Sequence, residues 1–144
     1  GDKAAVDRAV EIAKAKGAKR AMLLPVSAPF HCKLMQPAAD AMAAALAGVT
    51  IKTPASPLVS NVLAAPITDP DEIRRRLVEQ VTGTVRWRES VAYMAAHGVT
   101  RFFEIGAGKV LSGLVKRIAD GAVGVSVGGP NDIAGARDAL AASA

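Results

Sequence analysis

A histidine stands at the junction between two differently patterned stretches of this sequence. His31 follows the apolar run Ala21–Val26, which predicts a buried strand, and it precedes a helical pattern that begins near Leu34. In α/β enzymes the junction between a strand and the next helix faces the active site, and imidazole exchanges a proton near neutral pH. His31 is therefore a candidate general base. The alternative is a histidine whose ring nitrogens are paired only to support the fold.

The sequence offers no evident nucleophile to accompany this base. Ser27, Ser60 and Ser112 all lie outside the Gly-x-Ser-x-Gly frame that exposes a nucleophilic serine on a tight strand-to-helix turn. Cys32 is adjacent to His31, but neighbouring side chains normally point apart, so we expect a small side chain packed at the start of the helix.

Several short motifs occur in an order and at separations that resemble the malonyl-CoA:acyl carrier protein transacylases, the acyl-loading enzymes of fatty-acid synthesis. They are Gly17-Ala18-Lys19-Arg20, Pro29-Phe30-His31-Cys32, Leu34-Met35-Gln36-Pro37-Ala38-Ala39, Val59-Ser60-Asn61-Val62, Leu77-Val78-Glu79-Gln80, Val85-Arg86-Trp87 and Glu104-Ile105-Gly106-Ala107-Gly108-Lys109-Val110-Leu111. The likeness extends from about Lys3 to about Ile118.

The resemblance implies catalytic roles for His31 and Gln80. His31 matches the histidine that takes the proton of a serine hydroxyl and returns it to the coenzyme A thiolate. Gln80 matches the glutamine whose main-chain carbonyl accepts a hydrogen bond from the other ring nitrogen, in place of the carboxylate of a serine-protease triad.

The resemblance also implies two substrate-binding residues. Phe30 matches a residue that shapes the pocket around the carbon bearing the malonyl carboxylate, and its alternative role is to fill the seam between subdomains. Asn61 matches the end of a strand beside the catalytic histidine, where its amide orients the acyl group or a water. Its alternative role is that of a turn residue after a strand.

Other parts that the family uses do not occur in this sequence. These are the Gly-His-Ser-x-Gly nucleophile elbow, the early glycine–glutamine segment that supplies an oxyanion donor, and the arginine that pairs with the malonyl carboxylate. We therefore expect the C-terminal portion of such an enzyme, inactive by itself, with the N-terminal half as its first partner. The other implied partners are malonyl-CoA and acyl carrier protein with its phosphopantetheine thiol, and no cofactor is expected.

The charge balance favours an acidic partner. The net charge is +5 and the isoelectric point is about 9.7, which under the resemblance suits the phosphates of coenzyme A and the acidic carrier protein. Nucleic acid is not expected, because the basic residues are scattered and no zinc-finger, RNP or basic-zipper pattern occurs. The run Arg74-Arg75-Arg76 is either a solvated helix face or a docking surface for the carrier's acidic helix.

Further patterns set limits on location and on other sites. The single cysteine excludes an internal disulfide, and there is neither a leader pattern nor an apolar run of about 18 residues, so we expect a cytoplasmic protein that does not contact membranes. No cluster has metal-ligand spacing. Gly106-Ala107-Gly108-Lys109 lacks both the earlier glycine and the following Ser or Thr of a phosphate loop.

The element pattern predicts an α/β fold with a largely parallel sheet and flanking helices. Helices are expected over 3–16, 34–47, 70–80, 87–97, 109–118 and 132–142, and strands over 21–26, 58–62, 101–105 and 122–127. By the resemblance, residues 1–27 form the second half of a ferredoxin-like subdomain and residues 28–144 the C-terminal part of a hydrolase-like acyltransferase core. Two alternatives remain: an acyltransferase domain of a polyketide or fatty-acid synthase, and a catalytically silent α/β fragment.

Overall fold

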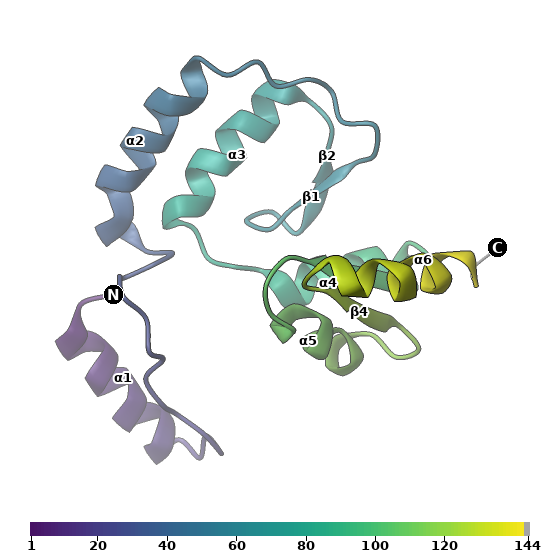
Figure 1. Ribbon diagram of the computed structural model, residues 1–144. Helices are drawn as coiled ribbons and strands as arrows, with labels where there is room; N and C mark the ends of the chain where they lie inside the picture. The colour runs from purple at the N-terminus through teal and green to yellow at the C-terminus, as the bar shows by residue number, and fades with distance from the viewer. Residues whose placement is uncertain (143–144) are drawn as a thin grey trace. The chain divides into compact units, whose positions relative to one another are not determined.

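The computed structural model describes residues 1–142, and the chain divides into two compact units, of which the first is Gly1–Val85 and the second begins at Arg86 (Figure 1). The first unit contains α1 (Lys3–Ala15), a 3-10 turn (Lys33–Met35), α2 (Gln36–Ala47), β1 (Leu58–Ser60), β2 (Ala65–Ile67) and α3 (Pro70–Thr82). The second contains α4 (Trp87–Ala96), β3 (Arg101–Ile105), α5 (Val110–Ile118), β4 (Val123–Val127), a 3-10 turn (Pro130–Asp132) and α6 (Ile133–Ala141).

Helices α2 and α3 pack side by side, and α3 is anchored at its start (Figure 1). The Asp69 carboxylate accepts a hydrogen bond from the Glu72 amide at 2.7 Å, and Pro70 occupies the first helical position. Both features favour a helix start, as the sequence predicts. Arg74 on α3 donates to the carbonyls of Leu46 and Val49, the latter at 2.9 Å. Its guanidinium therefore joins α3 to the end of α2, where the Leu46 carbonyl also accepts from the Val49 amide at 3.1 Å.

A short antiparallel hairpin precedes α3. Leu58 pairs with Ile67 and Ser60 with Ala65, and the turn is closed by a bond of 2.7 Å from the Ala64 amide to the Ser60 carbonyl. Sequence reasoning missed β2, because proline disfavours strands and Pro66 lies at its centre.

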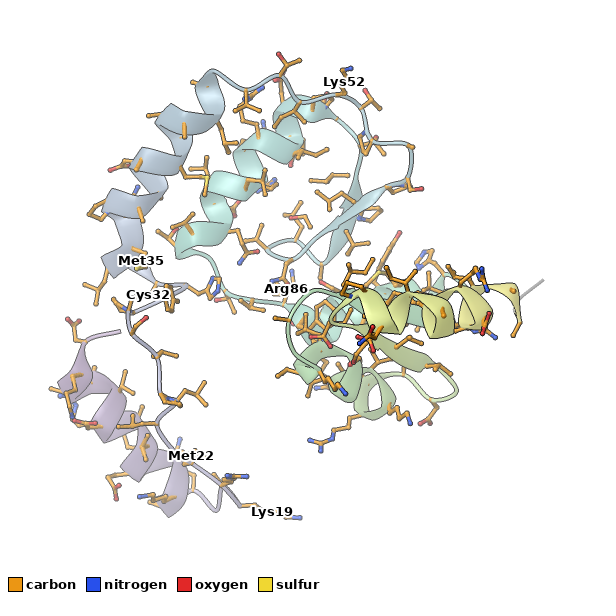
Figure 2. The ribbon with its side chains drawn as sticks, in the orientation of Figure 1. Lys19, Met22, Cys32, Met35, Lys52 and Arg86 are labelled. Carbon is orange, nitrogen blue, oxygen red and sulfur yellow. The ribbon has the colours of Figure 1, made fainter. Side chains whose placement is uncertain are left out.

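The predicted strand over residues 21–26 is wrong. This segment forms no strand, and the residues Met22, Leu23 and Leu24 are 52% to 72% exposed. A strand requires a hydrogen-bonded neighbour, and none of the described residues pairs with this segment. Figure 2 labels Met22 on this extended stretch, which lines a shallow cavity together with α1.

The second unit is a compact β-α-β arrangement. Strands β3 and β4 pair in parallel from Arg101↔Val123 to Ile105↔Val127, with α5 connecting them. Val91 and Val115 are fully buried at the centre of its core, together with Ala119 and Ala122.

Gly124 on β4 lies directly against α5. A Cβ atom there would come within 2.3 Å of the Ser112 carbonyl oxygen, so only glycine allows the strand and helix to approach this closely. The observed elements confirm the α/β class, with parallel pairing in this unit and antiparallel pairing in the hairpin.

The helices agree with the predicted ones to within two residues at each end. The expected subdomain division into residues 1–27 and 28–144 stays a prediction, while the division into two compact units falls after Val85 in the sequence. Among residues 1–142, no helix combines the length and the apolar character needed to cross a membrane.

Candidate active site

His31 lies in a tight turn between the extended segment and α2. Its φ is 57°, in the left-handed region that non-glycine residues occupy at a cost of about 1–2 kcal/mol. The turn is held by a bond of 2.9 Å from the Phe30 amide to the Ala28 carbonyl and by the Cys32 thiol on the Pro29 carbonyl at 3.2 Å. Figure 2 shows Cys32 and Met35 at this entry to α2. The bonds around His31 thus hold an unfavourable backbone conformation at the position of the candidate base.

The imidazole of His31 is paired with the main chain of Gln80. His31 Nδ1 lies 3.1 Å from the Gln80 carbonyl oxygen, although 49 residues separate them in sequence. Gln80 lies in the last turn of α3, where carbonyls have no partner within the helix. A carbonyl only accepts, so this contact assigns the proton to Nδ1 and leaves a lone pair on Nε2, as a general base requires.

The side chain of Gln80 folds back over the end of α3. Its Nε2 donates to the Gly83 carbonyl at 3.2 Å and also lies 3.5 Å from His31 Nδ1, while its Oε1 is buried without a hydrogen-bond partner. A Cβ on Gly83 would lie 2.8 Å from the Val62 side chain and 2.9 Å from the Glu79 carbonyl. Sequence reasoning missed Gly83, and its position directly after the helix turn that contains Gln80 was the available signal.

Phe30 and His31 line one cavity of about 520 Å³, together with Lys3, Leu24 and Val26. Phe30 is 52% exposed as a residue, so it is not packed into a core of the described chain. The structure therefore brings the predicted pocket residue to the same cavity as the base, and its effect on substrate choice stays a prediction.

Asn61 occupies the turn that directly follows β1, because the strand ends at Ser60 and not at Val62 as predicted. It lines a second cavity of about 200 Å³ with Gln80 and Ile73, and its Oδ1 is buried without a partner. No hydrogen bond joins Asn61 to His31 within residues 1–142. Its substrate-binding role therefore stays a prediction.

The arginine run on α3 is engaged within the chain. Arg75 and Arg76 both pair with Glu72, the latter through Nε at 2.6 Å, and Arg76 also reaches Glu79. Such pairs at i,i+3 and i,i+4 spacing are usual on a solvated helix face. Docking of a carrier protein on this run stays a prediction.

Glu104 caps the start of α5, a structural contact that sequence reasoning missed. Its carboxylate accepts hydrogen bonds from the Ser112 amide at 2.8 Å and the Leu111 amide at 3.2 Å, at the start of α5. The Ser112 backbone bond is the main cause that lowers the pKa of Glu104. Its place at the end of β3, ahead of a glycine turn and a helix, was the available signal.

Ser112 and His97 have structural surroundings. The Ser112 hydroxyl is buried 2.7 Å from the Ser126 hydroxyl and contacts the Lys109 carbonyl in the preceding turn. His97 stacks on Tyr93 with ring centres 4.1 Å apart. Within residues 1–142 no group of three or more His, Cys, Asp or Glu side chains could hold a metal ion.

Among known proteins, this chain is similar to malonyl CoA-acyl carrier protein transacylases of several bacteria. The malonyl CoA-acyl carrier protein transacylase of Escherichia coli K12 is 49% identical over 136 residues, which is 94% of this chain and 44% of the relative. The Salmonella typhimurium enzyme is 52% identical over 120 residues, covering 83% of this chain and 39% of the relative. No family model matches the chain.

Solved structures agree in fold. The acyl-carrier-protein S-malonyltransferase of Bartonella henselae superposes with a TM-score of 0.90 at 52% identity, covering 98% of this chain and 45% of that one. A malonyl-transacylase solved in complex with a type II polyketide synthase acyl-carrier protein gives 0.88 at 42% identity, covering 96% and 45%.

The fold and the paired histidine define a segment of an α/β acyltransferase. The comparisons specify which kind: the chain belongs to the malonyl-CoA:acyl carrier protein transacylase family. It spans less than half the length of the curated relatives that it matches.

Proposed function

We propose that this chain is the C-terminal, histidine-bearing portion of a malonyl-CoA:acyl carrier protein transacylase. The observation that carries the proposal is the contact of 3.1 Å between His31 Nδ1 and the Gln80 main-chain carbonyl. It supports a base whose tautomer is set by a neutral acceptor, with Nε2 free to take a proton.

In the first half of the proposed reaction, His31 Nε2 takes the proton of a serine hydroxyl while the serine oxygen attacks the thioester carbonyl of malonyl-CoA. The tetrahedral intermediate then expels the coenzyme A thiolate, which receives that proton from the imidazolium. The products are a malonyl ester of serine and free coenzyme A.

In the second half, His31 takes the proton of the carrier's phosphopantetheine thiol, and the thiolate attacks the ester. The serine alkoxide leaves and recovers the proton from the imidazolium. In both halves the main-chain carbonyl of Gln80 accepts a hydrogen bond from His31 Nδ1–H. This bond favours the ring orientation in which Nε2 can take a proton and give it back.

The nucleophile must come from polypeptide outside these 144 residues, since the sequence contains no Gly-His-Ser-x-Gly elbow. The one Gly-x-Ser-x-Gly frame, Gly124-Val125-Ser126-Val127-Gly128, runs along β4 instead of a strand-to-helix turn, and the Ser126 hydroxyl lies 2.7 Å from that of Ser112. We therefore expect the isolated chain to form no malonyl adduct. The relative solved with an acyl-carrier protein supports a carrier protein as the second substrate.

A chimera tests this function. The matching 136 residues of the E. coli enzyme are replaced by this chain, and the purified chimera is weighed by mass spectrometry before and after malonyl-CoA is added. We expect the mass to rise by one malonyl group, and we expect His31→Ala to slow loading by about 10²–10⁴-fold, because a general base is lost.

The matched control in the chimera is His97→Ala, which removes a histidine remote in sequence from the site and should load at the parent rate. A folded chimera that acquires no malonyl group contradicts the function and supports a silent fragment. Normal loading by the His31→Ala chimera would remove His31 from the mechanism.

A second candidate is an acyltransferase domain within a larger synthase. The polyketide biosynthesis protein ThaF of Burkholderia thailandensis is 40% identical over 123 residues, which are only 11% of that protein. The size of the natural polypeptide that carries this sequence distinguishes the two. A stand-alone enzyme has about twice the length of this chain, as the 44% coverage of the E. coli relative indicates.

A further inference from the structure

Cys32 connects the turn that contains His31 to the helical segment that follows it. Its thiol donates to the Pro29 carbonyl at 3.2 Å, and its own carbonyl accepts from the Met35 amide at 2.9 Å. The first bond reaches back across Phe30 and His31. The second bond begins the 3-10 turn that leads into α2. Cys32 is therefore bonded to the chain both before and after its own position.

The thiol bond spans the residue with the unfavourable backbone. Residues 30 and 31 are the central residues of a tight turn from Pro29 to Cys32, and His31 takes its third position with a φ of 57°. Glycine or asparagine usually occupies a turn position with positive φ, because a Cβ makes the left-handed region costly. Another residue type persists there only where the surrounding contacts hold it. The bond from Cys32 to Pro29 is such a contact, since it closes the turn around His31.

The same turn is tied to the helix that carries Gln80. The 3-10 turn Lys33–Met35 contacts both α2 and α3, and His31 Nδ1 lies 3.1 Å from the Gln80 carbonyl in the last turn of α3. If the backbone of His31 relaxed, the attached ring would move away from that carbonyl. Cys32 does not line the cavity that Phe30 and His31 share, so its thiol is placed to act on the turn and not on a bound substrate.

We propose that Cys32 is a positioning residue: its thiol, bonded to the Pro29 carbonyl, holds the left-handed turn that keeps the His31 imidazole at the end of α3. The sulfur takes no part in the chemistry. The inference rests on the proposed function, because the position of the ring affects turnover only if His31 is the base. A hydrogen-bond donor at position 32 should therefore change the rate of acyl transfer and leave substrate binding unchanged.

Raman spectroscopy of the 144-residue chain tests the bond without any turnover. Cys32 is the single cysteine of the sequence, so the S–H stretching band belongs to it alone. Donation to a carbonyl weakens the S–H bond and lowers the frequency of this band. We expect the band of the folded chain to lie below that of the same chain unfolded in urea, where water replaces the carbonyl. Equal frequencies in the two states would overturn the inference.

The E. coli chimera described above tests the effect on rate. Cys32→Ala and Cys32→Val both remove the donor, the first with a smaller side chain and the second with a larger one. Each should lower the loading rate constant at saturating malonyl-CoA about fivefold, the change that one hydrogen bond of ordinary net strength produces. The malonyl-CoA concentration that gives half the maximal rate should stay the same. Cys32→Ser is the matched control, because it keeps a donor and should restore loading to within about twofold of the parent rate.

Three kinetic results would overturn the inference. They are parent-rate loading by Cys32→Ala, loading by Cys32→Ser as slow as that by Cys32→Ala, and a change confined to the half-saturating concentration of malonyl-CoA. Failure of the proposed function is recognisable separately, because His31→Ala would then also load at the parent rate. Slow loading by His31→Ala together with parent-rate loading by Cys32→Ala contradicts only the role of Cys32.

Discussion

Glu104 joins the end of β3 to the start of α5 through a single carboxylate. By accepting from the Leu111 and Ser112 amides, it satisfies helix N-terminal donors that would otherwise lack a partner. An anion such as phosphate would need the same amides, so the protein's own carboxylate occupies the position that the glycine turn before α5 suggests for a ligand.

This contact predicts an acid-sensitive step in stability. The pKa of Glu104 is lowered in the folded chain, chiefly by the Ser112 backbone hydrogen bond. Its stabilising effect is therefore fully present above the carboxyl's unfolded value and is lost as the pH falls through the lower folded value. We expect Glu104→Gln to lower the melting temperature at pH 7 and to remove part of the fall in melting temperature below about pH 4.5.

Thermal unfolding followed by circular dichroism from pH 7 to pH 3 measures this effect. Glu89→Gln is the control, because Glu89 makes an exposed ion pair of 3.5 Å with Arg86, and such pairs contribute little to stability. Equal pH profiles for the parent and Glu104→Gln would show that the carboxylate does not stabilise α5.

At the scale of elements, the second unit depends on close contact between β4 and α5. Gly124 faces the Ser112 backbone, and Val115 on the same helix is fully buried in the core. Because backbone atoms oppose the glycine, the contact cannot adjust by a side-chain rotation, and a larger residue must displace the helix.

Gly124→Val should destabilise the second unit by about 1–3 kcal/mol, the usual cost of overpacking. Urea unfolding monitored by Trp87, the single tryptophan of the chain, reports on this unit. Gly135→Ala in α6, where a Cβ meets nothing within 4 Å, should instead be neutral or stabilising. An unchanged urea midpoint for Gly124→Val would mean that α5 can move away at little cost.

Elements with complete local signals were predictable, and elements that depend on distant partners were not. The adjacent residues Asp69 and Pro70 are enough to predict where α3 begins, and the structure confirms this helix start. The run 21–26 has the composition of a buried strand but no partner among the described residues. The pairing of His31 with Gln80 spans 49 residues, and family resemblance predicted it where local pattern could not.

At the scale of the whole molecule, burial is distributed unevenly along the chain. Residues 1–31 contain no buried residue, whereas the second unit has a core around Val91 and Val115. Apolar side chains such as Leu24, 72% exposed, gain nothing from the hydrophobic effect in this state. The stability of the described chain therefore resides mainly in the segments that follow His31.

Hydrogen–deuterium exchange should show this difference directly. We expect peptides from residues 1–26 to exchange at least tenfold faster than peptides from β3 and β4, because unburied backbone opens at little free-energy cost. In the E. coli chimera described above, the same peptides should become protected as the remaining polypeptide covers them. Strong protection of residues 21–26 in the isolated chain would contradict the uneven burial.

The left-handed backbone at His31 determines which substitution best gives a folded but inactive variant. Alanine at this position would inherit φ of 57° without a side chain suited to it, whereas asparagine tolerates that region better than most residues. His31→Asn is accordingly the substitution that abolishes proton transfer while preserving the turn. In a reconstituted enzyme, His31→Asn would therefore be better suited than His31→Ala to holding an unreacted thioester for crystallography.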